Sequence, residues 1–455
     1  MKPPVSRTSG WPAALAFAAL TALALPAAGP RLALAAPHRA TTTITFWYGA
    51  DVDPSEKVNM QKLIVAPFEK AYPNIKLQLS FKANLTDLTK TTLAAGTGPD
   101  IVTADGPTTV VQYAESHLVT DLTPYAKKYD WAHKIFPWAL DSGRYKGGLY
   151  GIPNQYETII IYYNQTMFKK YGWKPATTWS QFEALCRAVA AKSIIPISFG
   201  TIGWRPAVEW MVGTFFGHDA GPYVTYEALT GKSPWTNPLL VDAMAKYNEL
   251  WQNGWLMDKK AFGTTLDQAW ALMKLQRAAM KMEGTWAFPS VTQAASSWQW
   301  DWMPYPIARS GVPQNYDLSI GGTLSINAHT RNKAAAATFL NWLYSDPKRE
   351  ARIIAAIPGD WVLPISIPAS DFPKSYDPRF LRALLAIQAA SRSGHFTYPT
   401  WTFFPPKTEQ KIIDDVYRLF NGDITPQKMM ADVQKSFLPE FKSGAVPPVP
   451  KPATP

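Results

Sequence analysis

Tryptophan residues that stand near carboxylates are the feature of this sequence best suited to chemistry. The chain has 455 residues and 19 tryptophans, several of which lie beside glycine, proline or an acidic residue instead of within an amphipathic stripe. The groupings are Trp47-Tyr48 with Asp51, Trp204-Arg205 with Glu209-Trp210, and Trp286. Sugars offer C–H faces that stack on aromatic rings and hydroxyl groups that need both donors and acceptors. The pattern favours a carbohydrate pocket, although any one of these tryptophans taken alone is more often a packing residue.

Other reactive residue types occur singly or without the spacing that their chemistry needs. The one cysteine, Cys186, rules out a disulfide framework, and its helical spacing with Phe182 and Val189 predicts a buried hydrophobic residue. The six histidines are isolated. Tyr226 stands where the first glycine of a phosphate loop ending in Gly231-Lys232-Ser233 would be needed. The sequence therefore predicts no metal, no cofactor and no bound nucleotide.

The carboxylates leave one catalytic alternative open. A glycoside hydrolase needs two carboxyl groups roughly 5 to 9.5 Å apart, one of them with a raised pKa. Glu157 could pair with Glu209 or Asp105 in such an enzyme, but no motif joins these residues. We therefore expect binding without catalysis, with a secreted glycoside hydrolase as the alternative.

The first basic residues belong to a segment that looks removable. Lysine and arginine number 45 against 34 acidic residues, which gives a net charge of +11. Lys2 and Arg7 precede a stretch rich in alanine and leucine, and Ala33-Leu34-Ala35 fits a small-residue cleavage pattern. We interpret residues 1–35 as a signal peptide, which predicts an extracytoplasmic protein in the periplasm or at the cell surface. The remaining basic residues form no cluster, so nucleic acid is not an expected partner.

Strand and helix signals alternate along the rest of the chain, which predicts an α/β fold. Runs of β-branched and aromatic residues predict buried strands at 41–49, 75–81, 100–104 and 158–164. Short connections among the first three favour parallel pairing with right-handed crossovers. Residues 236–282 have mostly helical patterns.

Proline dominates the end of the chain. Five of the last ten residues are proline, a composition typical of extended segments without a packed core. We therefore predict a disordered, solvated tail at 443–455.

Several segments, taken together in their order and spacing, resemble one protein family. They are residues 41–49, 68–75, 92–102, 150–168 and 278–286, and Gly321-Gly322 before the helix that starts near Ala334. Over nearly all of residues 41–440 the chain resembles the extracellular solute-binding proteins of ABC importers, in the sugar-binding group typified by maltose-binding protein.

The resemblance implies a periplasmic-binding-protein fold, with two α/β lobes, a ligand cleft between the lobes and several hinge crossings. The first lobe would comprise residues 41–156 and 320–362, and the second lobe residues 158–316 and 366–440. The resemblance also implies a monomer without enzymatic activity that captures a mono- or oligosaccharide. Such a protein would deliver the sugar to the membrane permease subunits of an ABC transporter.

The resemblance further assigns individual residues to the cleft. Glu157 stands seven positions before Asn164, the spacing of the family's hinge glutamate, and Trp286 matches a stacking tryptophan that follows a glycine. Together with the residues found by composition, the predicted ligand-binding set is Trp47, Tyr48, Asp51, Asp105, Glu157, Trp204, Arg205, Glu209, Trp286, Gly321, Gly322, Trp361 and Trp401. If the ligand is a glycerophosphodiester, which the same family also binds, Arg205 or Arg392 would have to face the cleft.

Overall fold

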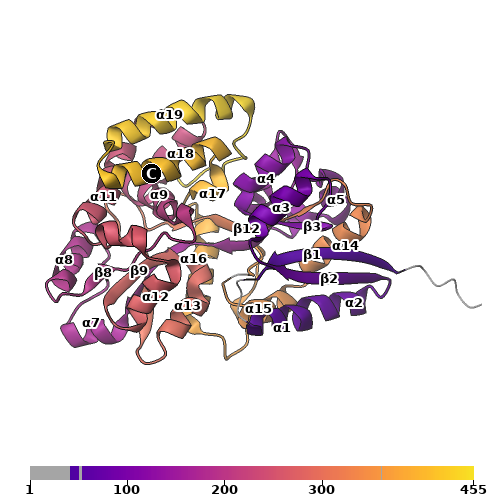
Figure 1. Cartoon of the computed structure of the whole chain (residues 1–455), viewed down its shortest axis with the longest axis horizontal. Helices are drawn as coiled ribbons and strands as arrows, with labels where there is room; N and C mark the ends of the chain where they lie inside the picture. The colour runs from indigo at the N-terminus through magenta and orange to yellow at the C-terminus, as the bar shows by residue number, and fades with distance from the viewer. Residues whose placement is uncertain (1–40, 51–53, 360, 455) are drawn as a thin grey trace, which may run out of the picture. The chain divides into compact units, whose positions relative to one another are not determined.

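The computed structural model describes residues 41–50, 54–359 and 361–454 as an α/β protein with two main sheets (Figure 1). The predicted signal peptide and Asp51 lie outside the described residues. Within the described ranges, no helix is long and apolar enough to cross a membrane.

The first sheet contains five strands in the order β2-β1-β3-β12-β6. These strands are β1 (Thr42–Gly49), β2 (Ile75–Lys82), β3 (Ile101–Asp105), β6 (Ile152–Glu157) and β12 (Ser319–Ile326). β1 pairs in parallel with β2 and with β3, which confirms the parallel β-α-β unit expected at the start of the chain. β12 runs antiparallel between β3 and β6. A strand from late in the chain therefore completes the sheet that β1 begins.

Helices lie on both faces of the first sheet (Figure 1). Figure 1 shows α3 and α4 on one side of β1 and β2, with α1, α2 and α15 on the other. These helices and their neighbours are α1 (Pro54–Met60), α2 (Ala66–Ala71), α3 (Leu85–Ala94), α4 (Gly106–Glu115), α5 (Thr123–Tyr129), α6 (Pro137–Ser142), α14 (Lys333–Leu343) and α15 (Pro347–Ala356). Aromatic packing joins the layers, because the Phe339 ring on α14 lies 6.0 Å from Phe46 on β1 and 5.0 Å from Phe68 on α2.

The second sheet has four strands in the order β10-β7-β9-β8. They are β7 (Ile159–Asn164), β8 (Ile195–Ile197), β9 (Ala278–Gly284) and β10 (Trp300–Met303). Every residue of β7 is buried, which confirms the buried strand predicted at 158–164. The helical expectation for 236–282 is only partly right. That stretch contains α11 (Pro238–Gln252) and α12 (Leu266–Lys274), but its end belongs to β9.

The remaining helices of this part pack around the second sheet. They are α7 (Gln165–Tyr171), α8 (Trp179–Ala190), α9 (Trp210–Phe215), α10 (Pro222–Leu229) and α13 (Phe288–Ala294), with short 3₁₀ turns at Arg205–Glu209 (η3) and Thr285–Ala287 (η6). Cys186 on α8 is fully buried in the core, as its spacing predicted, and burial raises the pKa of its thiol.

The chain passes between the two sheets at adjacent points. Thr158 lies between β6 and β7, and Leu318 lies between the short strand β11 (Tyr316–Asp317) and β12. The two crossings are hydrogen-bonded to each other, because the Asp317 backbone N–H donates to Thr158 Oγ1 at 3.0 Å. Residues 361–367 lie beside β6. The Val362 carbonyl accepts a hydrogen bond from the Tyr156 backbone N–H at 2.8 Å. The division into lobes at the residue limits given above stays a prediction.

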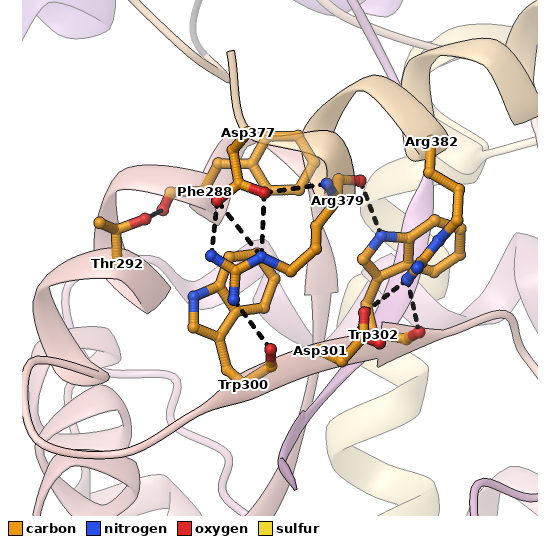
Figure 2. Close-up of polar contacts among 8 residues, drawn as sticks. All are labelled: Phe288, Thr292, Trp300, Asp301, Trp302, Asp377, Arg379 and Arg382. Atoms are coloured by element: carbon orange, nitrogen blue, oxygen red, sulfur yellow. Dashed lines mark hydrogen bonds and ion pairs between the residues drawn. The ribbon is translucent and has the colours of Figure 1, made fainter. Parts of the chain in front are cut away.

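The C-terminal helices attach to both parts of the chain. They are α16 (Pro378–Ser393), α17 (Thr400–Phe403), α18 (Pro406–Asn421) and α19 (Pro426–Ser443). Figure 2 shows how α16 is held on β10, with the Arg379 guanidinium 3.8 Å from the centre of the Trp300 ring and the Arg382 guanidinium 4.4 Å from that of Trp302. Asp377 at the helix start accepts hydrogen bonds from the Arg379 backbone and side chain. These stacked and charge-assisted contacts fix the helix to the strand.

The proline-rich tail is extended but is not solvated, which corrects the expectation of a disordered segment. Ala445, Pro447 and Pro452 are buried. The Tyr398 hydroxyl donates to the Pro450 carbonyl at 2.7 Å, and the Ala453 backbone N–H donates to the Gly394 carbonyl at 2.9 Å. Prolines preset an extended backbone at little entropic cost, and these two hydrogen bonds hold the tail against the protein.

Candidate functional site

A cleft of about 570 Å³ lies at one edge of the first sheet, where β3 and β6 end and β12 begins. Ligands of open α/β sheets bind at this edge, beyond the carboxyl ends of the parallel strands. A second hollow of about 480 Å³ shares Asp105, Trp204 and Gly321 with it, so the two form one continuous depression. Helical elements, including α3, α4, η3, η6, α17 and α18, supply most of the remaining lining.

Three tryptophans from different elements meet in this cleft. The Trp286 ring lies 5.1 Å from the Trp210 ring and 6.3 Å from the Trp401 ring, with interplanar angles of 67° and 80°. Trp286 Nε1–H donates to Glu283 Oε1 at 3.3 Å, which orients the indole. A Cβ atom on Gly284 would lie only 1.9 Å from the Trp286 ring. The glycine two positions before the tryptophan is therefore required for the ring to fold back over the chain.

Glu157 reaches the cleft from the end of β6 and is only 2% exposed. Ser319 Oγ–H donates to its Oε1 atom at 3.0 Å. Gly321 on the neighbouring strand β12 has no side chain to block this carboxylate, since an added Cβ would lie 2.4 Å from Glu157 Oε2. The pairing of a glutamate at a strand end with a glycine on the opposite strand places a carboxylate where a ligand can contact it.

Two further carboxyl groups lie against each other in the cleft. Glu209, at the end of η3, is 3% exposed, and Glu409 comes from the first turn of α18. Burial raises the pKa of Glu209, and the neighbouring Glu409 carboxyl raises it further. Burial likewise raises the pKa of Glu409, with Asp105 contributing in the same direction. The Oε2 atom of Glu209 is buried without a hydrogen-bond partner of ordinary geometry among the described residues, while the Thr400 side chain lowers the pKa of this carboxyl and the Glu409 side chain raises it.

Further acidic residues, Asp105 and Asp87, line the cleft beyond this pair. Thr86 Oγ1–H donates to Asp105 Oδ2 at 2.5 Å, but burial still raises the pKa of Asp105. Burial, together with the charges of Asp105 and Asp87, raises the pKa of Tyr113 to about 12. Among the described residues that line the cleft, Lys90 is the one that carries a positive charge.

Nine of the thirteen predicted site residues line the continuous depression. They are Asp105, Glu157, Trp204, Glu209, Trp286, Gly321 and Trp401 in the larger hollow, with Tyr48 and Gly322 in the adjoining one. Trp204 is 39% exposed, so part of this residue is open to a ligand. Residues far apart in the sequence thus come together as the resemblance implied, and their roles in binding stay a prediction.

Three predicted residues lie away from the cleft lining, and Asp51 is outside the described residues. Trp361 is fully buried in the core beside Tyr48, at 6.1 Å between ring centres, so it has no face for a ligand. The Arg205 guanidinium pairs with Asp414 at 2.7 Å and lies over the Tyr417 ring. Trp47 lies under the Lys82 ammonium, 5.2 Å from the ring centre.

Sequence reasoning missed several residues that line the cleft. Glu409, Tyr113, Gln155 and Asp87 were not among the predicted set. Trp210 was visible as the neighbour of Glu209, but nothing in its spacing separated it from a core tryptophan. Glu409 carried no signal, because an acidic residue in the first turn of an amphipathic helix is ordinary.

The cleft residues can bind but show no metal-ligand geometry. Over the ranges that the structure covers, no group of three or more His, Cys, Asp or Glu side chains is arranged to hold a metal ion. The aromatic rings can stack on an apolar face of a ligand while the buried carboxylates beside them accept hydrogen bonds from its polar groups. Such an arrangement defines a site for a small polar ligand with one apolar face.

Comparison with known proteins assigns the class. The chain belongs to the bacterial extracellular solute-binding protein family, whose model matches residues 64–359.

Solved structures share this fold over their full length. A protein from work on xylan utilization by the thermophilic bacterium Caldanaerobius polysaccharolyticus is 24% identical, with a TM-score of 0.72, over 86% of this chain and 99% of that one. A chitin oligosaccharide binding protein gives the same TM-score at 20% identity, over 89% of this chain and 99% of its own. The GacH receptor of Streptomyces glaucescens, studied with acarbose, is 17% identical with a TM-score of 0.68, over 88% and 99%.

Curated relatives match over shorter stretches. A probable sugar-binding periplasmic protein of Mesorhizobium japonicum is 32% identical over 120 residues, which is 26% of this chain and 28% of the relative. An uncharacterized ABC transporter extracellular-binding protein of Pyrococcus horikoshii is 25% identical over 153 residues, or 31% and 34%. The chain spans about a third of the length of these curated relatives.

Proposed function

We propose that this protein captures a mono- or oligosaccharide in the cleft and delivers it to the membrane permease subunits of an ABC transporter. The observation that carries the proposal is the meeting of Trp210, Trp286 and Trp401 with the buried carboxylates of Glu157 and Glu209 in one cleft. Stacking rings beside hydrogen-bond acceptors match the two faces of a sugar. The names of a sugar-binding periplasmic relative and of a chitin oligosaccharide binding neighbour support the same ligand class.

The remaining parts of the proposal follow from the family. We expect export by the signal peptide at residues 1–35, action outside the cytoplasm and a monomeric state. Membership of a solute-binding family supports binding without turnover, and we expect no hydrolysis of aryl glycosides or oligosaccharides. Turnover that the substitution Glu157→Gln abolishes would replace this proposal by a glycoside hydrolase.

The charges of the cleft favour a sugar over a glycerophosphodiester. A phosphodiester needs cationic partners, and the arginines considered for that role are placed elsewhere. Arg205 is paired with Asp414, and Arg392 lines a separate groove beside the C-terminal tail. Lys90 would then have to balance the phosphate alone against several carboxylates.

Titration calorimetry tests the binding proposal directly. The purified protein is titrated with mono- to tetrasaccharides, both neutral and amine-bearing, and with glycerol phosphates. We expect a saturable heat with saccharides and none with the phosphates. Binding of glycerol phosphates without any saccharide would overturn the carbohydrate assignment.

Reconstitution tests the delivery step. In liposomes that contain the cognate permease and ATPase, the protein should raise ATP hydrolysis only when its saccharide is present. Stimulation that does not depend on the saccharide, or no stimulation by a loaded protein, would contradict a role in import.

A further inference from the structure

We propose that the saccharide bound in this cleft carries a protonated amine, which the carboxyl groups of Glu209, Glu409 and Asp105 hold. The proposal rests on the proposed carbohydrate function and narrows its ligand class. It is carried by the charge balance of the cleft, by the unpartnered buried oxygen of Glu209 and by the aromatic rings beside it.

The charge balance of the cleft is opposite to that of the chain. Basic residues outnumber acidic ones by 45 to 34 over the whole sequence. Among the described residues of the cleft lining the order is reversed, because Lys90 is the single basic side chain against several acidic ones. Those acidic side chains are Asp87, Asp105, Glu157, Glu209 and Glu409. A basic protein that gathers carboxylates at its binding site presents a local field that attracts a cation.

The carboxyl groups line one cleft from separate elements. Glu209 ends η3, Glu409 lies in the first turn of α18, and Asp105 ends β3. Glu440 on α19 adds negative charge near Glu409, although its own oxygens accept from the Thr408 backbone and hydroxyl at 2.8 Å. No arginine lines the described part of the cleft. Like charges this close cannot all be ionised without a cation between them.

The buried carboxyl group of Glu209 gives the most direct evidence for a charged ligand. Its carboxyl is 3% exposed, lines the cleft and keeps an Oε2 atom without a hydrogen-bond partner of ordinary geometry among the described residues. A buried carboxylate is costly unless it is paired. A sugar hydroxyl could donate one hydrogen bond to this oxygen, but would bring no positive charge to the carboxyl pair. An ammonium group has three donors and a positive charge, so it can bond to both carboxylates at once.

The aromatic rings complete the recognition of an aminated sugar. Trp286 and Trp401 line the same cleft as Glu209, and the centres of their rings are 6.3 Å apart. A sugar ring that stacks on tryptophan would place an equatorial amine at its edge, where the carboxyl groups lie. The same rings attract a nearby ammonium through their negative faces.

Burial of the carboxyl pair gives the test a second readout, which is the release of protons on binding. Because burial raises the pKa of Glu409 to about 8, the empty pair retains a proton near neutral pH. An ammonium ligand replaces that proton, so its binding should release protons to the buffer. A neutral sugar has no reason to do so.

The experiment compares sugars that differ only at the amine. Glucosamine, galactosamine and mannosamine, and glucosamine di- and trisaccharides, are each titrated against their N-acetylated and hydroxyl counterparts by calorimetry in two buffers of different ionisation enthalpy. We expect at least one amine to bind at least tenfold more tightly than both counterparts, with proton release. The substitution Glu409→Gln should reduce that preference at least tenfold and abolish most of the proton release.

A matched control lies on the same helix. Asp414 on α18 pairs with Arg205 away from the cleft lining, so Asp414→Asn should leave the amine preference unchanged. Melting curves of both variants establish that they fold. Neutral sugars that bind as tightly as the amines would overturn the amine proposal and leave the carbohydrate function standing. Failure of every saccharide to bind would overturn both.

Discussion

Trp286 shows how much a single ring depends on its neighbours in the sequence. Gly284 leaves room for the indole, and Glu283 accepts its N–H at 3.3 Å. The ring is therefore held in one orientation before any ligand arrives, so little conformational entropy is lost on binding.

We expect Trp286→Ala to weaken saccharide binding by about 2 to 4 kcal/mol, as the loss of a buried aromatic anchor does. Titration calorimetry measures the change, and thermal unfolding monitors stability. Trp173 is the matched control, because it stacks on Tyr171 at 4.7 Å and does not line the cleft. Equal affinities for Trp286→Ala and the unaltered protein would contradict a stacking role.

Gly321 allows a second test at the scale of one atom. The substitution Gly321→Ala places a Cβ against the Glu157 carboxylate, and such overpacking costs about 1 to 3 kcal/mol of stability. We expect a lower melting temperature and weaker saccharide binding, since Glu157 must move. Gly263→Ala is the control, because a Cβ there has no heavy atom within 4 Å. If both variants behave alike, the close approach at Gly321 has no effect.

Residue types predicted part of the site but not its geometry. Tryptophan next to carboxylate correctly drew attention to Trp204, Glu209 and Trp286, which line the cleft. The predicted ligand-binding set also included Trp361, which is fully buried in the core. Residue type does not tell which side of a sheet a tryptophan faces, and that depends on packing by distant segments.

At the scale of elements, local patterns were reliable where side chains alternate or cluster. β1 and β2 were expected within a residue of their observed limits because β-branched and aromatic residues mark them. β9 was missed, since alanine, methionine, lysine and glutamate are good helix formers. Its seven residues are all buried between β7 and β8, so tertiary packing overrides the helical preference.

Asp317, in the strand β11 beside a crossing, predicts a pH dependence of stability. Burial raises its pKa to about 7, although Thr214 Oγ1–H donates to the carboxyl. The folded state thus binds a proton that the unfolded state has released above about pH 4. Stability should fall as pH rises from about 4 to 7, by up to about 1.4 kcal/mol per pH unit from this group.

Asp317→Asn should remove this contribution and flatten the curve in that window. Urea unfolding at several pH values measures it, and Asp423→Asn serves as an exposed control. An unchanged slope in Asp317→Asn would show that other groups cause the pH dependence.

At the scale of the whole molecule, the two sheets and their crossings predict motion. Only a closed form can contact a sugar from both sides, and a ligand shifts the equilibrium by its differential affinity for the two forms. We expect solution scattering to give a smaller radius of gyration with saturating saccharide than without it. The Trp286→Ala variant at the same saccharide concentration is the control. An unchanged radius with bound saccharide would indicate a rigid, preformed cleft.

The discontinuous division of the chain could not be predicted from periodicity. Nothing local in residues 319–326 indicates that they insert between β3 and β6. That topology was expected only through the resemblance of ordered segments to a known family, because strand order depends on contacts between distant parts of the chain.

The position of β12 also bears on the order in which the protein can fold. β3 ends at Asp105 and pairs with a strand that begins at Ser319, so more than two hundred residues separate the partners. A chain made from its N-terminus cannot complete the first sheet until most of it has been synthesised, and such distant pairings form slowly. The growing polypeptide therefore stays incompletely folded for longer than one whose sheets close locally. For a chain that residues 1–35 direct to export, as proposed above, that delay would give an export machinery that handles extended chains time to act before the native structure forms.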